Sequence, residues 1–246
     1  MAKHYIILSS SYSRGERIAL DFVDLSPDKR DIISGLIEKI KRECGEDAAV
    51  SLHAVESRGA EWKSVGEADP FFANVVKIDS DDEFISLIKR DRVLTGLDVA
   101  KFVLSVVKGC THLKLEKLVY LCYADYLCAT NGGRLFEDEI YAYRYGPVVK
   151  SVYKYYRKYA GAPIDEKELP ERKYYLSARS RILFSENGTK KLASIVETTD
   201  RYGQMSGGEL IELTHRPGTP WSHTDSELPD MPISDEVIAA YHCNEI

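Results

Sequence analysis

The chain has 246 residues, of which 44% are hydrophobic and 29% are charged, and its formal net charge is −6. This composition is typical of a folded globular protein with one large or two small domains, and it excludes a chain that is mainly disordered. The negative charge also argues against a dedicated nucleic-acid-binding protein.

The N-terminus carries only a short apolar run, Tyr5–Leu8, before a cluster of serines, which is too short for a signal peptide. No segment reaches the ~18–20 consecutive apolar residues of a transmembrane helix. We therefore expect a cytoplasmic protein with no membrane partner. Its cysteines form no CxxC pair, so we expect buried free thiols and no zinc site. They are Cys44, Cys110, Cys122, Cys128 and Cys243.

The first ninety residues mix strand and helix patterns. Strands are predicted over residues 4–8, 17–23, 49–55 and 73–78. Ser26 and Pro27 resemble the start of a helix, which continues with helical spacing of apolar residues and ends at Cys44 and Gly45. Ser80 is predicted to cap a further short helix. This pattern predicts a small α/β domain over residues 1–92, without a family that we can name.

From Thr95 onward the pattern is mainly helical. Helices are predicted from Thr95 to Gly109 and from His112 to Ala129, with Lys114 and Lys117 on the outer face of the second. Asn131-Gly132-Gly133 should end that helix, because these residues accept a left-handed backbone.

Residues 137–145 are expected to be extended, and Pro147 is expected to start the next helix. An exposed loop is predicted over residues 162–172 and a short strand over 180–184. Further helices are predicted from Asn187, from Ser206 to Leu213 and from Ser234 to His242, with an irregular proline-containing stretch before the last. The whole chain is therefore predicted to be α+β, with a mainly helical domain over residues 95–246.

Four segments of this helical part carry a family resemblance. They are Leu115–Tyr120 (LEKLVY), Gly133–Ile140 (GRLFEDEI), Ala142–Val149 (AYRYGPVV), and Glu209–His215 (ELIELTH) with Pro220-Trp221. Together, in this order, they resemble the Panacea, or SocA-like, antitoxin domain over about residues 97–241. Tyr143 stands where the family usually has Trp, and Leu115 stands where it has Lys.

The resemblance implies an antitoxin that neutralises a cognate protein toxin, encoded by an adjacent gene, through direct protein–protein binding. It also implies an alternative, a proteolytic adaptor that delivers the toxin to a AAA+ protease. The family has no established catalytic residue, so the resemblance implies no enzyme and no cofactor. Residues 1–92 would then serve as a module that sets partner specificity.

Residues 141–160 contain seven tyrosines, five basic residues and no acid. Tyrosine and arginine are frequent anchors of protein interfaces, so we expect this segment to bind the partner. A solvated helix face and a nucleic-acid contact are the alternatives. Helical spacing places Val148, Val152, Tyr155 and Tyr159 inward. The expected partner-binding residues are Tyr143, Arg144, Tyr145, Lys150, Tyr153, Lys154, Tyr156 and Arg157.

Four further residues of the motifs are expected to be structural. Gly146 permits a tight turn, Pro147 fixes the backbone after it, and Trp221 packs on a helix end. His215 lacks a nucleophile or an orienting carboxylate at a recognisable spacing, so we expect it to bond to a nearby carbonyl and not to be a catalytic base. The acidic residues 137–139 are expected to be solvated and not to hold a metal.

Overall fold

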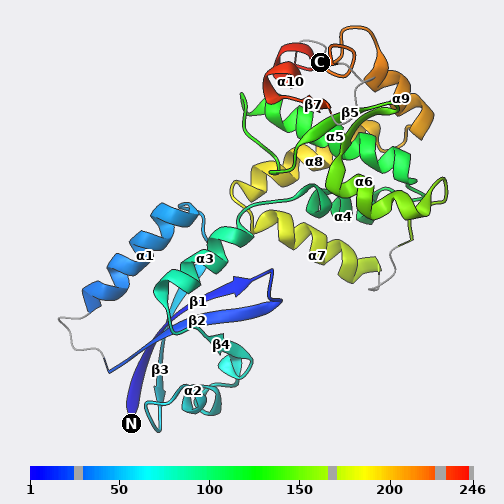
Figure 1. The fold of residues 1–246 in the computed structure, drawn as a ribbon. Helices are drawn as coiled ribbons and strands as arrows, with labels where there is room; N and C mark the ends of the chain where they lie inside the picture. The colour runs from blue at the N-terminus through cyan, green and yellow to red at the C-terminus, as the bar shows by residue number, and fades with distance from the viewer. Residues whose placement is uncertain (25–29, 166–170, 225–230, 244–246) are drawn as a thin grey trace. The chain divides into compact units, whose positions relative to one another are not determined.

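The computed structural model describes residues 1–24, 30–165, 171–224 and 231–243. The chain divides into two compact units (Figure 1), one of residues 1–93 with 184–186, and one of residues 94–183 and 187–246. The first unit is rich in strands and the second is mainly helical, so the fold is α+β as predicted.

A four-stranded sheet in the order β3-β1-β2-β4 is the centre of the first unit. β1 (Ala2–Ser11) pairs antiparallel with β2 (Glu16–Val23) and with β3 (Val50–Ser57), whereas β4 (Val75–Lys77) runs parallel to β2. The predicted strands are confirmed, with small changes at their ends.

Successive strand residues point to opposite sides of the sheet, and apolar residues occupy both sides. Helices therefore cover both faces. Ile7 and Ile18 pack in one apolar cluster with residues of α1 (Arg30–Cys44) and α3 (Asp81–Asp91). Ile6 and Leu8 pack in another with residues of α2 (Trp62–Ala68) and the 3-10 helix η2 (Pro70–Phe72). Sequence analysis missed α2 and η2. The Ser80 cap is confirmed, and Ser26 and Pro27 lie outside the described residues.

The second unit is built around α5 (His112–Ala129), whose predicted bounds are confirmed. The helices α4 (Gly96–Val106), α6 (Lys150–Tyr156), α8 (Gly188–Tyr202), α9 (Gly207–His215) and α10 (Asp235–Tyr241) all contact it. A helix that is enclosed in this way has little solvent-facing surface. Lys117 is 0% exposed, so its predicted place on an outer face is wrong.

A small antiparallel sheet in the order β6-β5-β7 packs beside α5. Its strands are β5 (Ile140–Tyr143), β6 (Gly146–Val149) and β7 (Met231–Ile233). Pro147 therefore lies in a strand, and the helix predicted to begin there begins at Lys150 and continues as the 3-10 helix η3 (Arg157–Tyr159). β7 occupies part of the stretch that we expected to be irregular.

The segment before α8 also differs from expectation. Residues 180–184 are not a strand, because α7 (Glu171–Leu183) covers all but the last of them. The predicted loop over 162–172 is only partly described: residues 162–165 contain no helix, residues 166–170 lie outside the described ranges, and α7 begins at 171.

The C-terminal segment is fastened covalently to α5 by a disulfide between Cys128 and Cys243. The expectation of free thiols is therefore wrong for these two residues, although Cys44, Cys110 and Cys122 are free and buried. A periodicity argument sees only that Cys128 lies on an apolar helix, and a partner 115 residues away in sequence leaves no local pattern. Among the described helices, none has the length and apolar content needed to cross a bilayer.

Candidate functional site

The turn between β5 and β6 brings together residues from three of the four motifs. Tyr143 pairs with Gly146 across the hairpin, so Arg144 and Tyr145 form its tip. Gly146 has a φ of +101°, a backbone conformation that residues with a side chain rarely adopt. The space around it is also filled, because a Cβ atom on Gly146 would lie 2.9 Å from Cε1 of His215 and 2.9 Å from Cε of Lys117.

Two neighbouring charged residues of α5 hold the strand that follows this turn. The Nζ atom of Lys117 donates a hydrogen bond to the main-chain oxygen of Pro147 at 2.9 Å. The amide of Val149 donates to Oε2 of Glu116 at 3.3 Å. Both side chains are buried. Glu116 and Lys117, neighbours on α5, therefore hold β6 by hydrogen bonds to its backbone from inside the core.

Burial changes the pKa of both groups. It lowers the pKa of Lys117 to about 7, and the nearby carboxylate of Glu116 opposes part of this effect. Burial also raises the pKa of Glu116, against the effects of His112 and Lys117. The Nε2 atom of His112 lies 3.3 Å from Oε1 of Glu116, but neither atom has a hydrogen-bond partner of good geometry. The pair is thus held in an environment that disfavours charge.

His215 and Trp221 fix the other side of the turn. The two ring nitrogens of His215 face main-chain oxygens: Nδ1 lies 2.7 Å from that of Ile211, and Nε2 lies 3.3 Å from that of Arg144. Main-chain oxygens can only accept, so the imidazole donates wherever one of these contacts is a hydrogen bond. The indole Nε1 of Trp221 donates to the oxygen of Tyr143 at 2.8 Å, and the rings of His215 and Trp221 lie 3.8 Å apart. Both residues hold the hairpin through its backbone.

The exposed tip and α6 carry the residues that we expected to bind a partner. Their placement differs from the sequence prediction at two tyrosines. Tyr156 is 0% exposed, so its predicted outward position is wrong, whereas Tyr155, predicted to face inward, is 42% exposed. Arg144, Tyr145, Lys154 and Arg157 are exposed; Tyr143, Lys150 and Tyr153 are half-buried.

Aromatic and basic side chains are in contact across this surface. The rings of Tyr143 and Tyr153 lie 5.3 Å apart, edge to face. The guanidinium of Arg144 lies 5.7 Å from the ring centroid of Tyr145, and Nζ of Lys150 lies 5.0 Å from that of Tyr141. Within the described residues, no acidic side chain forms an ion pair with Arg144, Lys154 or Arg157. The arrangement offers rings and available positive charge together.

A polar cluster in the first unit has the order of groups found in serine hydrolases. Nδ1 of His4 lies 2.9 Å from the carboxylate of Asp21, and Nε2 lies 3.0 Å from Oγ of Ser57. Ser57 is buried, however, and its hydroxyl donates to the main-chain oxygen of Gly59 at 2.6 Å. The cluster therefore joins β1, β2 and β3 and presents no nucleophile. The described residues also contain no group of side chains suited to a metal ion.

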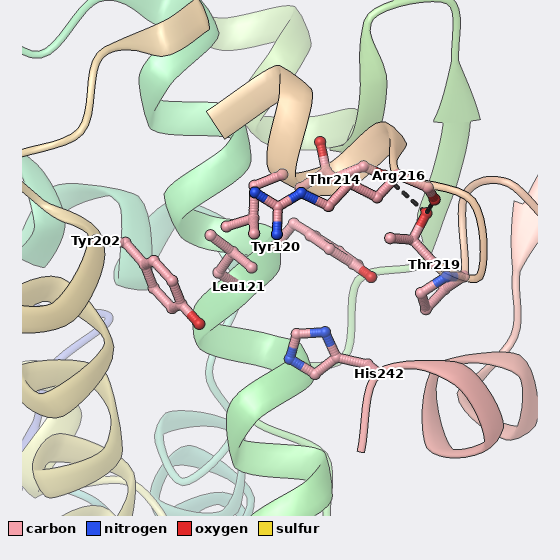
Figure 2. A pocket seen from close by; sticks show the side chains of 9 residues that line it. Tyr120, Leu121, Tyr202, Thr214, Arg216, Thr219 and His242 are labelled. Atoms are coloured by element: carbon pink, nitrogen blue, oxygen red, sulfur yellow. Dashed lines mark hydrogen bonds between the residues drawn. The ribbon is translucent and has the colours of Figure 1, made fainter. Parts of the chain in front are cut away.

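A pocket with a volume of about 90 Å³ opens beside α5 (Figure 2). Tyr120 and Leu121 of α5, Tyr202 at the end of α8, and Arg216 after α9 contribute side chains, together with His242 after α10. Sequence analysis did not predict this pocket, because its residues come from segments far apart in the chain. Four of them, Tyr120, Leu213, Thr214 and Pro220, nevertheless belong to the first and last of the four motifs.

The turn geometry predicts a large effect for Gly146→Ala. Backbone strain should cost about 1–2 kcal/mol, and the clash with His215 and Lys117 should add about 1–3 kcal/mol. Gly132→Ala is the matched control, because Gly132 has the same φ of +101° but nothing within 4 Å of an added Cβ. Chemical denaturation should show a larger loss of unfolding free energy for Gly146→Ala. Equal losses would contradict the packing argument.

The low pKa of Lys117 predicts a pH dependence of stability. Between the folded pKa of about 7 and the ordinary value of 10.5, the unfolded chain binds a proton at Lys117 that the folded chain does not bind. The free energy of unfolding therefore rises with pH in this window, by about 1.4 kcal/mol per pH unit from this group.

Denaturation at pH 8, 9 and 10 would measure this slope. Lys117→Met should flatten it, whereas Lys190→Met, at an exposed position of α8, should leave it as in the unaltered protein. The same slope in all three proteins would show that Lys117 keeps an ordinary pKa.

Comparison with known families finds a match to a segment that contains the residues around the turn. The family model described as "Antitoxin SocA-like, Panacea domain" matches residues 115–222. This segment lies within the predicted range of 97–241 and includes Lys117, Gly146, His215 and Trp221. No curated protein and no solved structure matches the chain. Residues 115–222 of the helical unit are therefore similar to the Panacea domain of SocA-like antitoxins.

Proposed function

We propose that this protein is an antitoxin that neutralises a protein toxin by direct binding. The proposal rests on the Panacea domain and on the surface of Tyr143, Arg144, Tyr145, Lys150, Tyr153, Lys154 and Arg157, named here the tyrosine–basic surface. The observation that carries it is the combination of ordered rings with three cations, Arg144, Lys154 and Arg157, that no described acidic side chain neutralises.

The chemistry of this surface favours a partner with an acidic face. Rings that already pack on each other lose little conformational freedom on binding, so more of the contact energy remains for affinity. Tyr143 and Tyr153 are held in this way, while Tyr145 is 59% exposed at the hairpin tip. Arg144, Lys154 and Arg157 would then meet carboxylates of the toxin and set its orientation.

The turn beneath this surface supports the proposal. The side chains of Trp221 and Lys117 donate hydrogen bonds to main-chain oxygens of the two strands next to the tip. Arg144 and Tyr145 are therefore presented on a rigid element. A preorganised site loses less entropy on binding than a flexible loop. On this proposal, the buried motif residues act on binding only through the backbone that carries the tip.

Charge reversal tests the proposed surface. The triple variant Arg144→Glu, Lys154→Glu, Arg157→Glu should fail to protect cells that express the toxin encoded by the adjacent gene. Its affinity in a pull-down or titration should fall by at least about tenfold, because three attractive contacts become repulsive. A matched control reverses three exposed cations of α7 and α8, Lys173, Arg179 and Lys190, and should keep protection.

The outcomes separate the surface from the function. Full protection by the triple variant would exclude this surface while leaving the antitoxin proposal intact. No rescue and no co-purification with the unaltered protein would exclude the antitoxin proposal itself. The half-life of the toxin distinguishes the alternative, because a proteolytic adaptor for a AAA+ protease shortens it and simple occlusion does not.

We propose that the first unit sets partner choice, since its residues 1–93 lie outside the matched Panacea segment. A chain without residues 1–92 should lose protection while the remaining unit keeps its helical circular dichroism spectrum and cooperative unfolding. Full protection by this shortened chain would exclude the proposed role. If the shortened chain loses cooperative unfolding, a second variant is needed, in which residues 1–92 are replaced by those of a relative that neutralises another toxin. This exchange should redirect protection to that other toxin.

A further inference from the structure

The pocket beside α5 has the size of a site for one small chemical group. Its volume is about 90 Å³, whereas sites for cofactors and drug-sized ligands usually enclose about 300–1,000 Å³. A nucleotide or a flavin is therefore too large for it. One amino-acid side chain or a short organic acid is of the right size.

Two basic side chains face this space from different elements. Figure 2 shows the guanidinium of Arg216 and the imidazole of His242 on opposite sides of the pocket. None of the residues that line the pocket is acidic. Among the described residues, none forms an ion pair with Arg216. The guanidinium thus keeps its N–H donors available for an anion, and these donors match the two oxygens of a carboxylate.

His242 is held in place by a carboxylate behind it. Its Nε2 lies 2.8 Å from Oδ1 of Asp125, and the other oxygen of Asp125 accepts a hydrogen bond from Thr198 at 2.7 Å. With Nε2 donating to Asp125, Nδ1 is left for a ligand, and it donates to an anion only when the imidazole is protonated on both nitrogens. The disulfide between Cys128 and Cys243 fixes the residue after His242 to α5, so the imidazole has a defined position.

The other walls fit the carbon atoms of a small acid. Leu121 and Leu213 supply apolar surface, and the hydroxyls of Thr214 and Thr219 already donate to the main-chain oxygens of Leu210 and Thr214. The charged donors of the pocket are therefore the two basic residues, and the hydroxyls of Tyr120 and Tyr202 also line it. A group with a short apolar stem and a charged end satisfies all of these walls.

We propose that this pocket binds a carboxylate with a short aliphatic stem, held by Arg216 and His242. The carboxylate belongs either to an acidic side chain of a bound protein or to a free organic acid. The proposal does not depend on the antitoxin function, because the pocket residues are not those of the tyrosine–basic surface.

Titration of the full oxidised chain, followed by nuclear magnetic resonance, tests this site with defined probes. Propionate represents the free acid, and the blocked peptide acetyl-Ala-Glu-Ala-amide represents an acidic side chain. Propionamide and the corresponding Gln peptide are neutral controls of the same shape. The carboxylate probes should shift the signals of Arg216 and His242 and bind at least about tenfold more tightly than their amides.

The ratio of the two carboxylate affinities identifies the source. Tighter binding of the Glu peptide assigns the pocket to a protein ligand, and equal or tighter binding of propionate assigns it to a free acid. Equal binding of carboxylates and amides, or no shift of pocket signals at millimolar probe, would overturn the proposal.

Variants test the roles of the named residues. Arg216→Gln should weaken carboxylate binding by about tenfold or more and should leave amide binding unchanged. Arg179→Gln, at an exposed position of α7 away from the pocket, is the matched control and should bind as the unaltered chain does. Retained carboxylate binding in Arg216→Gln, with an otherwise unchanged spectrum, would overturn the assignment of Arg216.

The disulfide offers a second, independent test. An excess of a thiol reductant converts the Cys128–Cys243 bond to two thiols while the reductant becomes a disulfide, and this releases the segment next to His242. Reduction should weaken carboxylate binding and leave the signals of the first unit unchanged. Unaltered affinity after complete reduction, established by thiol counting, would show that the fixed position of His242 is not needed.

Discussion

The amine of Lys117 lies inside the helical unit and donates its hydrogen bond to the main-chain oxygen of Pro147. Since the amine comes from the enclosed helix α5, the position of β6 is tied to the centre of the core. Gly146 must then pass between this side chain and His215, where no Cβ atom fits. The hairpin tip, the indole bond to β5 and the start of α6 all follow from where this strand is held.

Burying Lys117 and Glu116 next to each other carries a cost. Removing a charged group from water disfavours its charged form, as the pKa directions of both residues indicate. An apolar residue would avoid this cost, but it could not bind the backbone of β6 by a hydrogen bond. The pair therefore serves to place the strand and adds little to stability by itself, as is often true of buried charges.

Local signals in the sequence were enough to predict many elements. Asn131 marks the end of α5, because a left-handed residue acts on its own neighbours. Predictions failed where distant segments decide. Lys117 faces inward only because strands and helices from later in the chain cover α5. Helical spacing also could not decide between Tyr155 and Tyr156: Val152 is buried as predicted, and the inward face continues at Tyr156, four residues later, while Tyr155 is exposed. The pocket residues come from several elements, and no spacing along the chain indicates that they meet.

The bond between Cys128 and Cys243 closes a covalent ring around most of the matched Panacea segment, including the hairpin and α6 to α10. A single cut of the backbone anywhere inside this ring leaves the two fragments as one molecule as long as the disulfide persists. In a reducing compartment only noncovalent packing would hold the two fragments together. The redox state of the surroundings thus decides whether one proteolytic event leaves this domain covalently joined.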